Sequence, residues 1–353
     1  MTSEQTAVAA GPEVTAQPGD PALRVADLST TFRTNSGGRV AAVRSVNFEV
    51  YPGETLVLLG ESGSGKSVTA RAIMRLHGRN AEVDGEVMLG GQSLLTLSEA
   101  EMRGIRGGKV ALVPQDPSAA LDPLRRVGRQ LTEVLLLHKI CSAKAEAKVR
   151  AVELLRQVGI PDPKRVFHSY PHELSGGMRQ RVVIAIAISC DPVVIIADEP
   201  TTALDVTVQA QILELFAELQ QRVSTALLMI THDVLVAGDV ADVIAVMYAG
   251  RIVETGPARE VLDNAKHPYT RALLGAMPRP ETERGHLESI PGAPPLAGVE
   301  FPGCAFAERC SLATDSCRAA VPELVRVAER HLAACPVLNP AAESDGTHAG
   351  EVG

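Results

Sequence analysis

The chain has 353 residues, a hydrophobic content of 45% and an aromatic content of only 3%, with no Trp and a formal net charge of −8. This length fits one large domain with an appendage, or two modest domains. The acidic balance argues against a general affinity for nucleic acid, which usually needs a basic surface. We therefore expect no nucleic-acid partner.

No stretch predicts a transmembrane helix, because the most apolar region, residues 182–197, is interrupted by Asp191 and Pro192 and is too short to cross a bilayer. The first residues have neither the basic start nor the apolar core of a secretory signal. Without an export signal, we expect the six cysteines to lie in a reducing compartment. Cysteine clusters there favour metal or redox chemistry over disulfides.

Four short apolar runs, at residues 54–60, 109–114, 193–198 and 226–233, show no alternation of polar and apolar positions. Such runs are typical of parallel strands that are buried on both faces. Between the last two runs, an apolar stripe at helical spacing predicts a helix over residues 205–222. Strand, helix and strand in this order predict an α/β domain with a parallel sheet.

The rest of the chain divides by composition. Helical patterns replace strand signals between about residues 117 and 190, which predicts a helical insert between two core strands. After about residue 265 Pro becomes frequent, which indicates a linker or a loop-rich wrap. We expect a disordered tail at 1–21, a main domain at 22–265, an extension at 266–337 and a second disordered tail at 338–353.

The sequence GESGSGKS at residues 60–67 matches the pattern G-x-x-x-x-G-K-[ST] and lies between an apolar strand and a helical run. In such a loop the backbone N–H groups and the positive end of the following helix form a cradle for an anion. We expect Lys66 to reach the β- and γ-phosphates of a nucleotide and the Ser67 hydroxyl to bind Mg²⁺. A chance match to a Gly/Ser-rich turn is the alternative. The candidate phosphate-binding residues are Gly60, Ser62, Gly63, Ser64, Gly65, Lys66 and Ser67.

Two acidic residues follow the apolar run at 193–198. Asp198 ends the predicted strand, where its carboxylate can lie beside the Mg²⁺ site. Glu199 comes next, at the carboxyl edge of the sheet, and could deprotonate an attacking water. On their own these residues could also be a polar exit from a strand, but the phosphate loop favours the catalytic interpretation.

The segment ELSGGMRQRV at residues 173–182 resembles the signature sequence of the ATP-binding cassette (ABC) ATPases. The smaller motifs of that family also fall in the expected order along the chain. Gln115 resembles the Q-loop glutamine, which also contacts Mg²⁺, Asp205 the D-loop aspartate and His232 the switch histidine. The resemblance covers residues 22 to about 256. It implies a P-loop NTPase core of the ABC type, an N-terminal antiparallel β region, the helical insert and a small loop-rich C-terminal extension.

The resemblance also implies a head-to-tail dimer. Ser175, Gly176 and Gly177 precede a helix and could hold a γ-phosphate, so the signature of one subunit would close over the ATP that its partner binds. An aromatic residue usually supports adenine in this family, and Phe32 is the candidate, with Val43 and Arg39 as alternatives. Phe32 could also belong only to the core.

The segments HPYTRALLGAMP (267–278), IPGAPP (290–295) and PGCAFAERC (302–310) resemble the C-terminal extension of oligopeptide and dipeptide importer ATPases, a group that includes nickel importers. This resemblance implies a peripheral ATPase at the cytoplasmic face of the membrane. Its partners would be a second ATPase subunit (a heterodimer rather than a homodimer), two permease subunits and an extracytoplasmic solute-binding protein. A nickel or other small-solute importer, or a non-transport ABC ATPase, is the alternative.

Cys304, Cys310, Cys317 and Cys335 are separated by five, six and seventeen residues. Zinc sites usually contain closely spaced cysteine pairs, and none is present. A [4Fe–4S] cluster needs four thiolates and tolerates varied spacing, and members of the importer group with this pattern are thought to carry one. We expect a cluster, with Zn²⁺ or unliganded thiols as alternatives. Cys141 and Cys190 are expected to be buried small hydrophobes.

Overall fold

The computed structural model describes residues 19–34, 37–202, 204–277, 290–296 and 298–338. The tails expected at 1–21 and 338–353 therefore lie outside the described residues, apart from 19–21 and 338. None of the helices in the described ranges has both the length and the apolarity to cross a bilayer.

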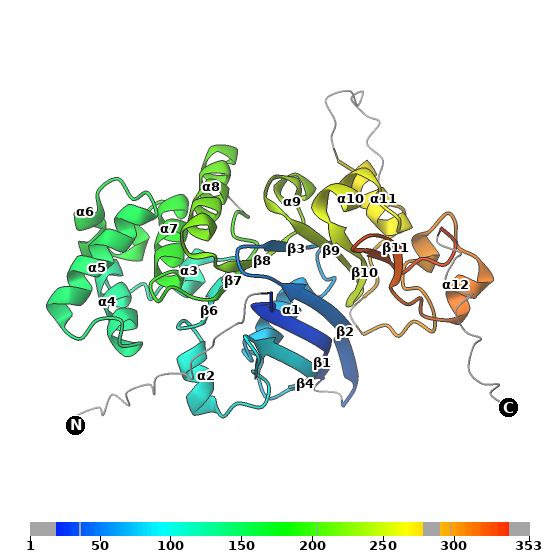
Figure 1. Ribbon diagram of the computed structural model, residues 1–353, viewed down its shortest axis with the longest axis horizontal. Coiled ribbons are helices and arrows are strands. Elements are labelled where there is room, and N and C mark those ends of the chain that lie inside the picture. The colour runs from blue at the N-terminus through cyan, green and yellow to red at the C-terminus, as the bar shows by residue number, and fades with distance from the viewer. Residues whose placement is uncertain (1–18, 35–36, 203, 278–289, 297, 339–353) are drawn as a thin grey trace.

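An eight-stranded sheet forms the centre of the molecule (Figure 1). Its order is β11 (Val325–Ala328), β12 (His331–Ala333), β10 (Arg251–Pro257), β9 (Val243–Tyr248), β3 (Thr55–Leu59), β8 (Ala226–Thr231), β7 (Val194–Asp198) and β6 (Val110–Val113). The strands from β9 to β6 are parallel, whereas β9, β10, β12 and β11 pair antiparallel. The predicted parallel strands are thus confirmed as β3, β6, β7 and β8.

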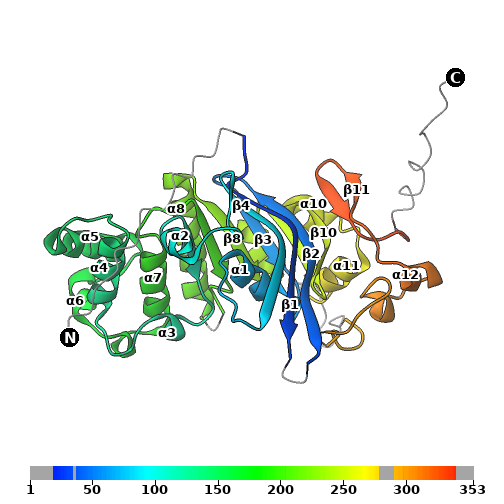
Figure 2. The ribbon, with the colours of Figure 1, turned by 90° about the horizontal axis from the view of Figure 1, so that it is seen from below.

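Strand β3 is apolar after Thr55 because the sheet is covered on both faces. Leu56 and Leu58 pack into the core shared with a second sheet, and Val57 and Leu59 pack into the opposite core with the helices. The second sheet is antiparallel, in the order β2 (Arg39–Val50), β1 (Leu23–Arg33), β4 (Ala81–Leu89) and β5 (Gln92–Ser93). Figure 2 shows β1, β2 and β4 lying together over the central strands.

Between β6 and β7 the described chain is helical, and it forms one end of the molecule in both views (Figures 1 and 2). The elements are α3 (Pro117–Ala120), α4 (Val127–Leu137), α5 (Lys144–Gln157), α6 (Pro163–His168), the 3₁₀ turn η1 (Pro171–Glu173) and α7 (Gly176–Ala187). The other helices are α1 (Lys66–Ile73), α2 (Glu99–Ile105), α8 (Val206–Val223), α9 (Val234–Val240), α10 (Ala258–Asp263) and α11 (Pro268–Gly275).

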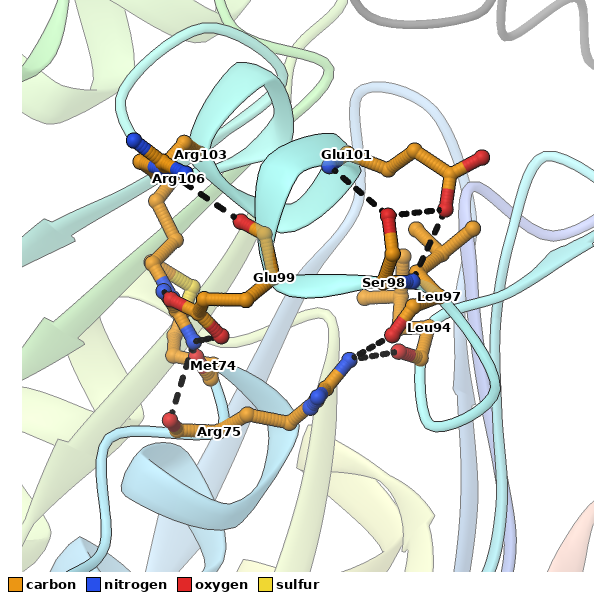
Figure 3. A network of polar contacts seen from close by, with 9 residues as sticks. All are labelled: Met74, Arg75, Leu94, Leu97, Ser98, Glu99, Glu101, Arg103 and Arg106. Atoms are coloured by element: carbon orange, nitrogen blue, oxygen red, sulfur yellow. Dashed lines mark hydrogen bonds and ion pairs between the residues drawn. The ribbon is translucent and has the colours of Figure 1, made fainter.

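Helix α2 is fixed to the end of α1 by a polar network (Figure 3). Ser98 and Glu101 form a capping box that satisfies free N–H groups at the start of α2. Arg106 donates from Nε to the Met74 carbonyl over 2.8 Å, and Arg75 donates to the Leu94 carbonyl over 3.2 Å. Two arginines therefore satisfy the carbonyls of loops that join the two sheets.

The C-terminal extension adds two strands to the central sheet. Strand β12 pairs with β10, which places Ala333 opposite Glu254, and β11 pairs with β12. His331 Nε2 lies 2.8 Å from Glu254 Oε1, and both side chains are fully buried. The remainder of the extension contains η2 (Ala307–Arg309) and α12 (Asp315–Ala319), which lies at the end of the molecule opposite the helical insert (Figure 1).

Candidate nucleotide-binding site

The phosphate loop joins β3 to α1. Gly60, Gly63 and Gly65 have φ values of 156°, 83° and 108°. A Cβ atom on Gly65 would lie 2.6 Å from the Ala42 carbonyl oxygen, and one on Gly60 would lie 2.3 Å from the Met247 carbonyl oxygen. Glycine is therefore required at both positions, since backbone from neighbouring strands passes directly against the loop.

Lys66 is the first residue of α1 and is only 4% exposed. Its Nζ donates to the carbonyls of Gly60 and Glu61 over 2.7 and 2.9 Å, so the ammonium lies under the loop. Burial lowers the pKa of Lys66 from its ordinary value, while the carboxylates of Glu199 and Asp198 oppose that effect. A buried cation within a loop of N–H groups is suited to a polyphosphate.

Ser67 and Asp198 meet where Mg²⁺ is expected. The Ser67 hydroxyl donates to Asp198 Oδ1 over 2.7 Å, and Asp198 is 5% exposed at the end of β7. Burial raises the pKa of Asp198, and the hydrogen bond from Ser67 lowers it. A hydroxyl and a carboxylate beside a phosphate loop supply the oxygen ligands that Mg²⁺ prefers, so these residues fit the ion.

Three side chains contact the carboxylate of Glu199. Gln115 Nε2 donates to Glu199 Oε2 over 2.9 Å, Thr202 Oγ1 donates to the same oxygen over 3.0 Å, and His232 Nδ1 lies 3.3 Å from Oε1. The backbone of Glu199 has a φ of 48°, which is rare for a residue with a side chain. This strained conformation is held by a hydrogen bond from the Glu199 N–H to the Ile230 carbonyl over 2.9 Å.

These groups border a cavity of about 390 Å³, a size suited to a small ligand. The predicted residues on its wall are Ser62, Gly63, Gly65, Lys66, Ser67, Gln115 and Glu199. Another part of the wall comes from the C-terminal extension, through Pro295, Leu296, Gly298, Val299 and Phe301. Arg44 of β2 holds this segment, because its Nη2 donates to the Val299 carbonyl over 2.6 Å and its guanidinium lies 5.9 Å from the Phe301 ring centre.

The candidates for adenine support lie elsewhere. Phe32 packs edge-to-face against His77, with 5.2 Å between ring centres, and the described cavity wall does not include it. Val43 is buried in the core, and Arg39 forms an ion pair with Glu82. The cavity is bordered instead by Ala41, Ala42 and Arg44 of β2. No local pattern predicts that Arg44 and Phe301 meet, because 257 positions separate them.

Two of the residues predicted for the signature and the D-loop, Ser175 and Asp205, lie at the starts of two helices, α7 and α8. Ser175 caps α7 by accepting a hydrogen bond from the Met178 N–H over 3.3 Å, and Asp205 caps α8 by accepting one from the Val208 N–H over 2.9 Å. A Cβ atom on Gly177 would lie 2.7 Å from Val208, so the two helix starts are in contact. Gly176 is open, with Leu204 at 4.0 Å as its nearest neighbour.

The four late cysteines line one small cavity of about 20 Å³, together with His267 and Phe306. None of the four forms a disulfide in the described structure, and neither does the buried Cys141 or Cys190. Burial raises the pKa of Cys304 and of Cys335. Within the described ranges, no group of three or more His, Cys, Asp or Glu side chains is placed to hold a metal ion. The four thiols therefore line one cavity but are not arranged as a metal site in the described structure.

The site combines features that define an ABC ATPase. They are a phosphate loop, the Asp198–Ser67 pair, Glu199 held by Gln115 and His232, and a capped signature helix. Two family models agree: ABC transporter over residues 43–202, and oligopeptide/dipeptide transporter, C-terminal region, over residues 253–317. The chain belongs to the ABC transporter family, in the group that carries the oligopeptide/dipeptide transporter C-terminal region.

Individual relatives are similar over most of their length. The chain is 49% identical to an oligopeptide transport ATP-binding protein of Bacillus subtilis, over 90% of this chain and 89% of the relative. It is 47% identical to a dipeptide transport ATP-binding protein of Lactococcus lactis, over 91% of this chain and 92% of the relative. A solved dimer of the ATP-binding cassette MJ0796 with ADP and Pi matches with a TM-score of 0.60 and 28% identity, over 67% of this chain and 99% of that chain.

Proposed function

We propose that the chain is the ATP-hydrolysing subunit of an importer for oligopeptides or dipeptides. The observation that carries the proposal is the junction of a nucleotide cavity with an oligopeptide/dipeptide transporter C-terminal region in one chain. Relatives that are named for oligopeptide and dipeptide transport support the choice of cargo. A nickel or other small-solute importer, and a non-transport ABC ATPase, are outcomes that the experiment below distinguishes.

In the proposed reaction, the loop at 60–67 and Lys66 bind the phosphates. Ser67, Asp198 and Gln115 would hold Mg²⁺, and the ion would neutralise charge on the phosphates. Glu199 would accept a proton from the water that attacks the γ-phosphorus, while the bond to the β-γ bridging oxygen breaks. Gln115, Thr202 and His232 orient the Glu199 carboxylate through the contacts described above. His232 would also contact the γ-phosphate.

The working unit is proposed to be a head-to-tail pair. In the described residues, the cavity wall contains no signature residue. Ser175, Gly176 and Gly177 would instead contact a nucleotide that a partner subunit binds. With Asp205 at the same helix starts, these groups would close over ATP held by the other subunit. The partner is proposed to be a second ATPase subunit, and the pair is proposed to bind two permeases at the cytoplasmic face of the membrane.

Reconstitution tests the proposal. The chain, its partner ATPase and two permeases are placed in proteoliposomes with the solute-binding protein, and uptake of a labelled peptide is measured with internal MgATP. ATP-dependent peptide uptake that is lost with Glu199→Gln supports the proposal. Uptake of Ni²⁺ but not peptide would assign a metal importer, and ATPase activity that ignores permeases and binding protein would favour a non-transport role.

We also propose that Cys304, Cys310, Cys317 and Cys335 bind a [4Fe–4S] cluster, with Zn²⁺ as the alternative. Four thiols on one cavity match the donor set of such a cluster. A cavity of about 20 Å³ has room for little more than one water molecule, so the surrounding loops must separate on binding. The cluster would join loops that have little regular structure of their own.

Anaerobic purification distinguishes these cofactors. A brown protein with about four irons per chain supports Cys₄ ligation of a cluster, provided that the iron content falls in Cys310→Ser. A colourless protein with one zinc per chain would assign a structural zinc site, and a protein with neither metal would show that the thiols are unliganded. Cys141→Ser is the matched control, because Cys141 is a buried thiol of the helical insert.

A further inference from the structure

Arg309 of the extension reaches the phosphate loop from 248 positions away. Its Nη1 donates to Glu61 Oε2 over 2.8 Å and its Nη2 donates to Glu61 Oε1 over 3.2 Å, which makes a two-pronged ion pair. The Arg309 side chain is only 6% exposed. Glu61 is the second residue of the loop, directly after Gly60.

The other donors of Arg309 are also used. Nε donates to the Pro291 carbonyl over 2.7 Å, and Nη1 lies 3.3 Å from the Tyr248 hydroxyl oxygen. The guanidinium lies 5.8 Å from the ring centres of Tyr248 and Phe306. The group is thus fixed on all sides, as a residue that sets the position of its partner must be.

A second contact holds the backbone of the same loop residue. The Glu61 N–H donates to the Tyr269 hydroxyl over 2.9 Å, and Tyr269 is fully buried in α11. The Glu61 carbonyl accepts from Lys66 Nζ over 2.9 Å. Side chain, N–H and carbonyl of Glu61 therefore link the region after residue 265 to the phosphate-binding lysine.

We propose that Arg309 is a positioning residue for the phosphate loop, so that the affinity of the chain for ATP depends on the docked C-terminal extension. Arg309 itself does not touch the phosphates; it acts through Glu61 on the conformation of the loop. The contact also links the cysteine region to the phosphate loop, because η2 (Ala307–Arg309), which carries Arg309, lies between Cys304 and Cys310. This inference rests on the proposed ATP binding at residues 60–67.

The test compares single variants with their combination. Dissociation constants for a non-hydrolysable ATP analogue are measured by calorimetry for the full chain, Arg309→Gln, Glu61→Gln and the double variant. We expect each single variant to weaken binding about tenfold, which equals about 1.4 kcal/mol. The double variant should bind no worse than either single variant, since both remove one interaction. At saturating ATP the turnover rate should change less than the KM.

Two further variants separate positioning from folding. Arg318→Gln removes an arginine of the same extension that pairs with Glu308 on an exposed surface, and it should leave the affinity unchanged. Arg309→Lys keeps the charge without the planar fork and should recover only part of the affinity. Glu61 lies in the main domain. Glu61→Gln therefore still tests whether the contact between Arg309 and Glu61 sets the affinity for ATP if an Arg309 variant fails to fold.

Wild-type affinity retained in both Arg309→Gln and Glu61→Gln would overturn the inference. So would additive losses in the double variant, because they would show that the two residues act independently. A wild-type chain that binds no ATP analogue would instead overturn the proposed function. The two failures are therefore distinguishable.

Discussion

Gln115 and Glu199 meet over 2.9 Å although 84 positions separate them. Each follows a parallel strand, β6 or β7, and these strands are neighbours, with Val113 paired to Ala197. The carboxyl ends of both strands therefore lie at one edge of the sheet. Because Gln115 lies just before the first helix of the helical insert, α3, we expect a movement of that insert to change the orientation of the Glu199 carboxylate.

Replacing Gln115 tests this relationship. In Gln115→Ala the Glu199 carboxylate loses one of its orienting contacts, so we expect kcat to fall about tenfold with little change in the KM for ATP. Gln115→Glu places a second carboxyl group beside Glu199 and should shift the pH profile of kcat toward higher pH, because two neighbouring carboxylates repel each other. Steady-state kinetics across pH measure both effects. Unchanged kcat in Gln115→Ala would contradict the assigned role.

Ser67→Ala tests the Mg²⁺ site. The change removes one oxygen ligand and leaves the buried Asp198 without the hydroxyl that donates to it. We expect the Mg²⁺ concentration for half-maximal ATPase activity to rise about tenfold. Ser67→Thr keeps the hydroxyl and should stay near wild type. An identical Mg²⁺ dependence in Ser67→Ala and wild type would place the ion elsewhere.

Phe301→Ala tests the part of the cavity wall that the extension supplies. An aromatic ring on the wall offers a surface for the base, and stacking between a base and an aromatic side chain contributes roughly 1–3 kcal/mol. We expect weaker binding of a non-hydrolysable ATP analogue but unchanged binding of inorganic triphosphate, which has no base. Calorimetry measures both. Equal losses for the two ligands would show that Phe301 only supports the fold.

His267 makes the folding stability of the extension depend on pH. Burial lowers the pKa of His267 to about 3, and its Nδ1 accepts a hydrogen bond from the Tyr269 N–H over 3.1 Å. Below the unfolded-state pKa of about 6.5 the unfolded chain binds a proton that the folded chain excludes, so the stability from neutral His267 is lost as pH falls.

We expect this group to remove about 2 kcal/mol of folding free energy between pH 7 and pH 5. His267→Asn keeps an N-cap without a titrating ring, so its stability should fall less over the same range. Denaturant unfolding at both pH values measures the difference. Identical pH dependence in the two chains would show that His267 is protonated or accessible in the folded state.

The central parallel strands could be predicted from the sequence, because burial on both faces requires a continuous apolar run. The sequence also predicted the phosphate loop and the acidic pair, since glycines and carboxylates at fixed spacing carry a local signal. The contacts of Arg309 with Glu61 and of Arg44 with Phe301 have no such signal. They arise when segments far apart in sequence pack together, and no local spacing marks the residues involved.

The extension shows the same limit. Strands β11 and β12 have four and three residues, which is too short for a reliable alternation pattern. Strand β12 pairs with β10 and β11 pairs with β12, and the buried contact of His331 with Glu254 joins β12 to β10. Adenine support was expected from an aromatic residue before the loop, whereas the ring of Phe32 packs against His77. The course of the β1–β2 hairpin decides that outcome, and spacing alone does not.

The most direct measurement is ATP turnover by the wild-type chain and Glu199→Gln, with chromatographic sizing of each in the presence of MgATP and its partner ATPase. Glutamine keeps the shape of the side chain but cannot accept the proton, so the variant should bind ATP, hydrolyse it at a small fraction of the wild-type rate and elute as an ATP-dependent dimer. Wild-type turnover by Glu199→Gln, or no ATP-dependent dimer, would contradict the assignment of Glu199 as the base in a shared nucleotide site.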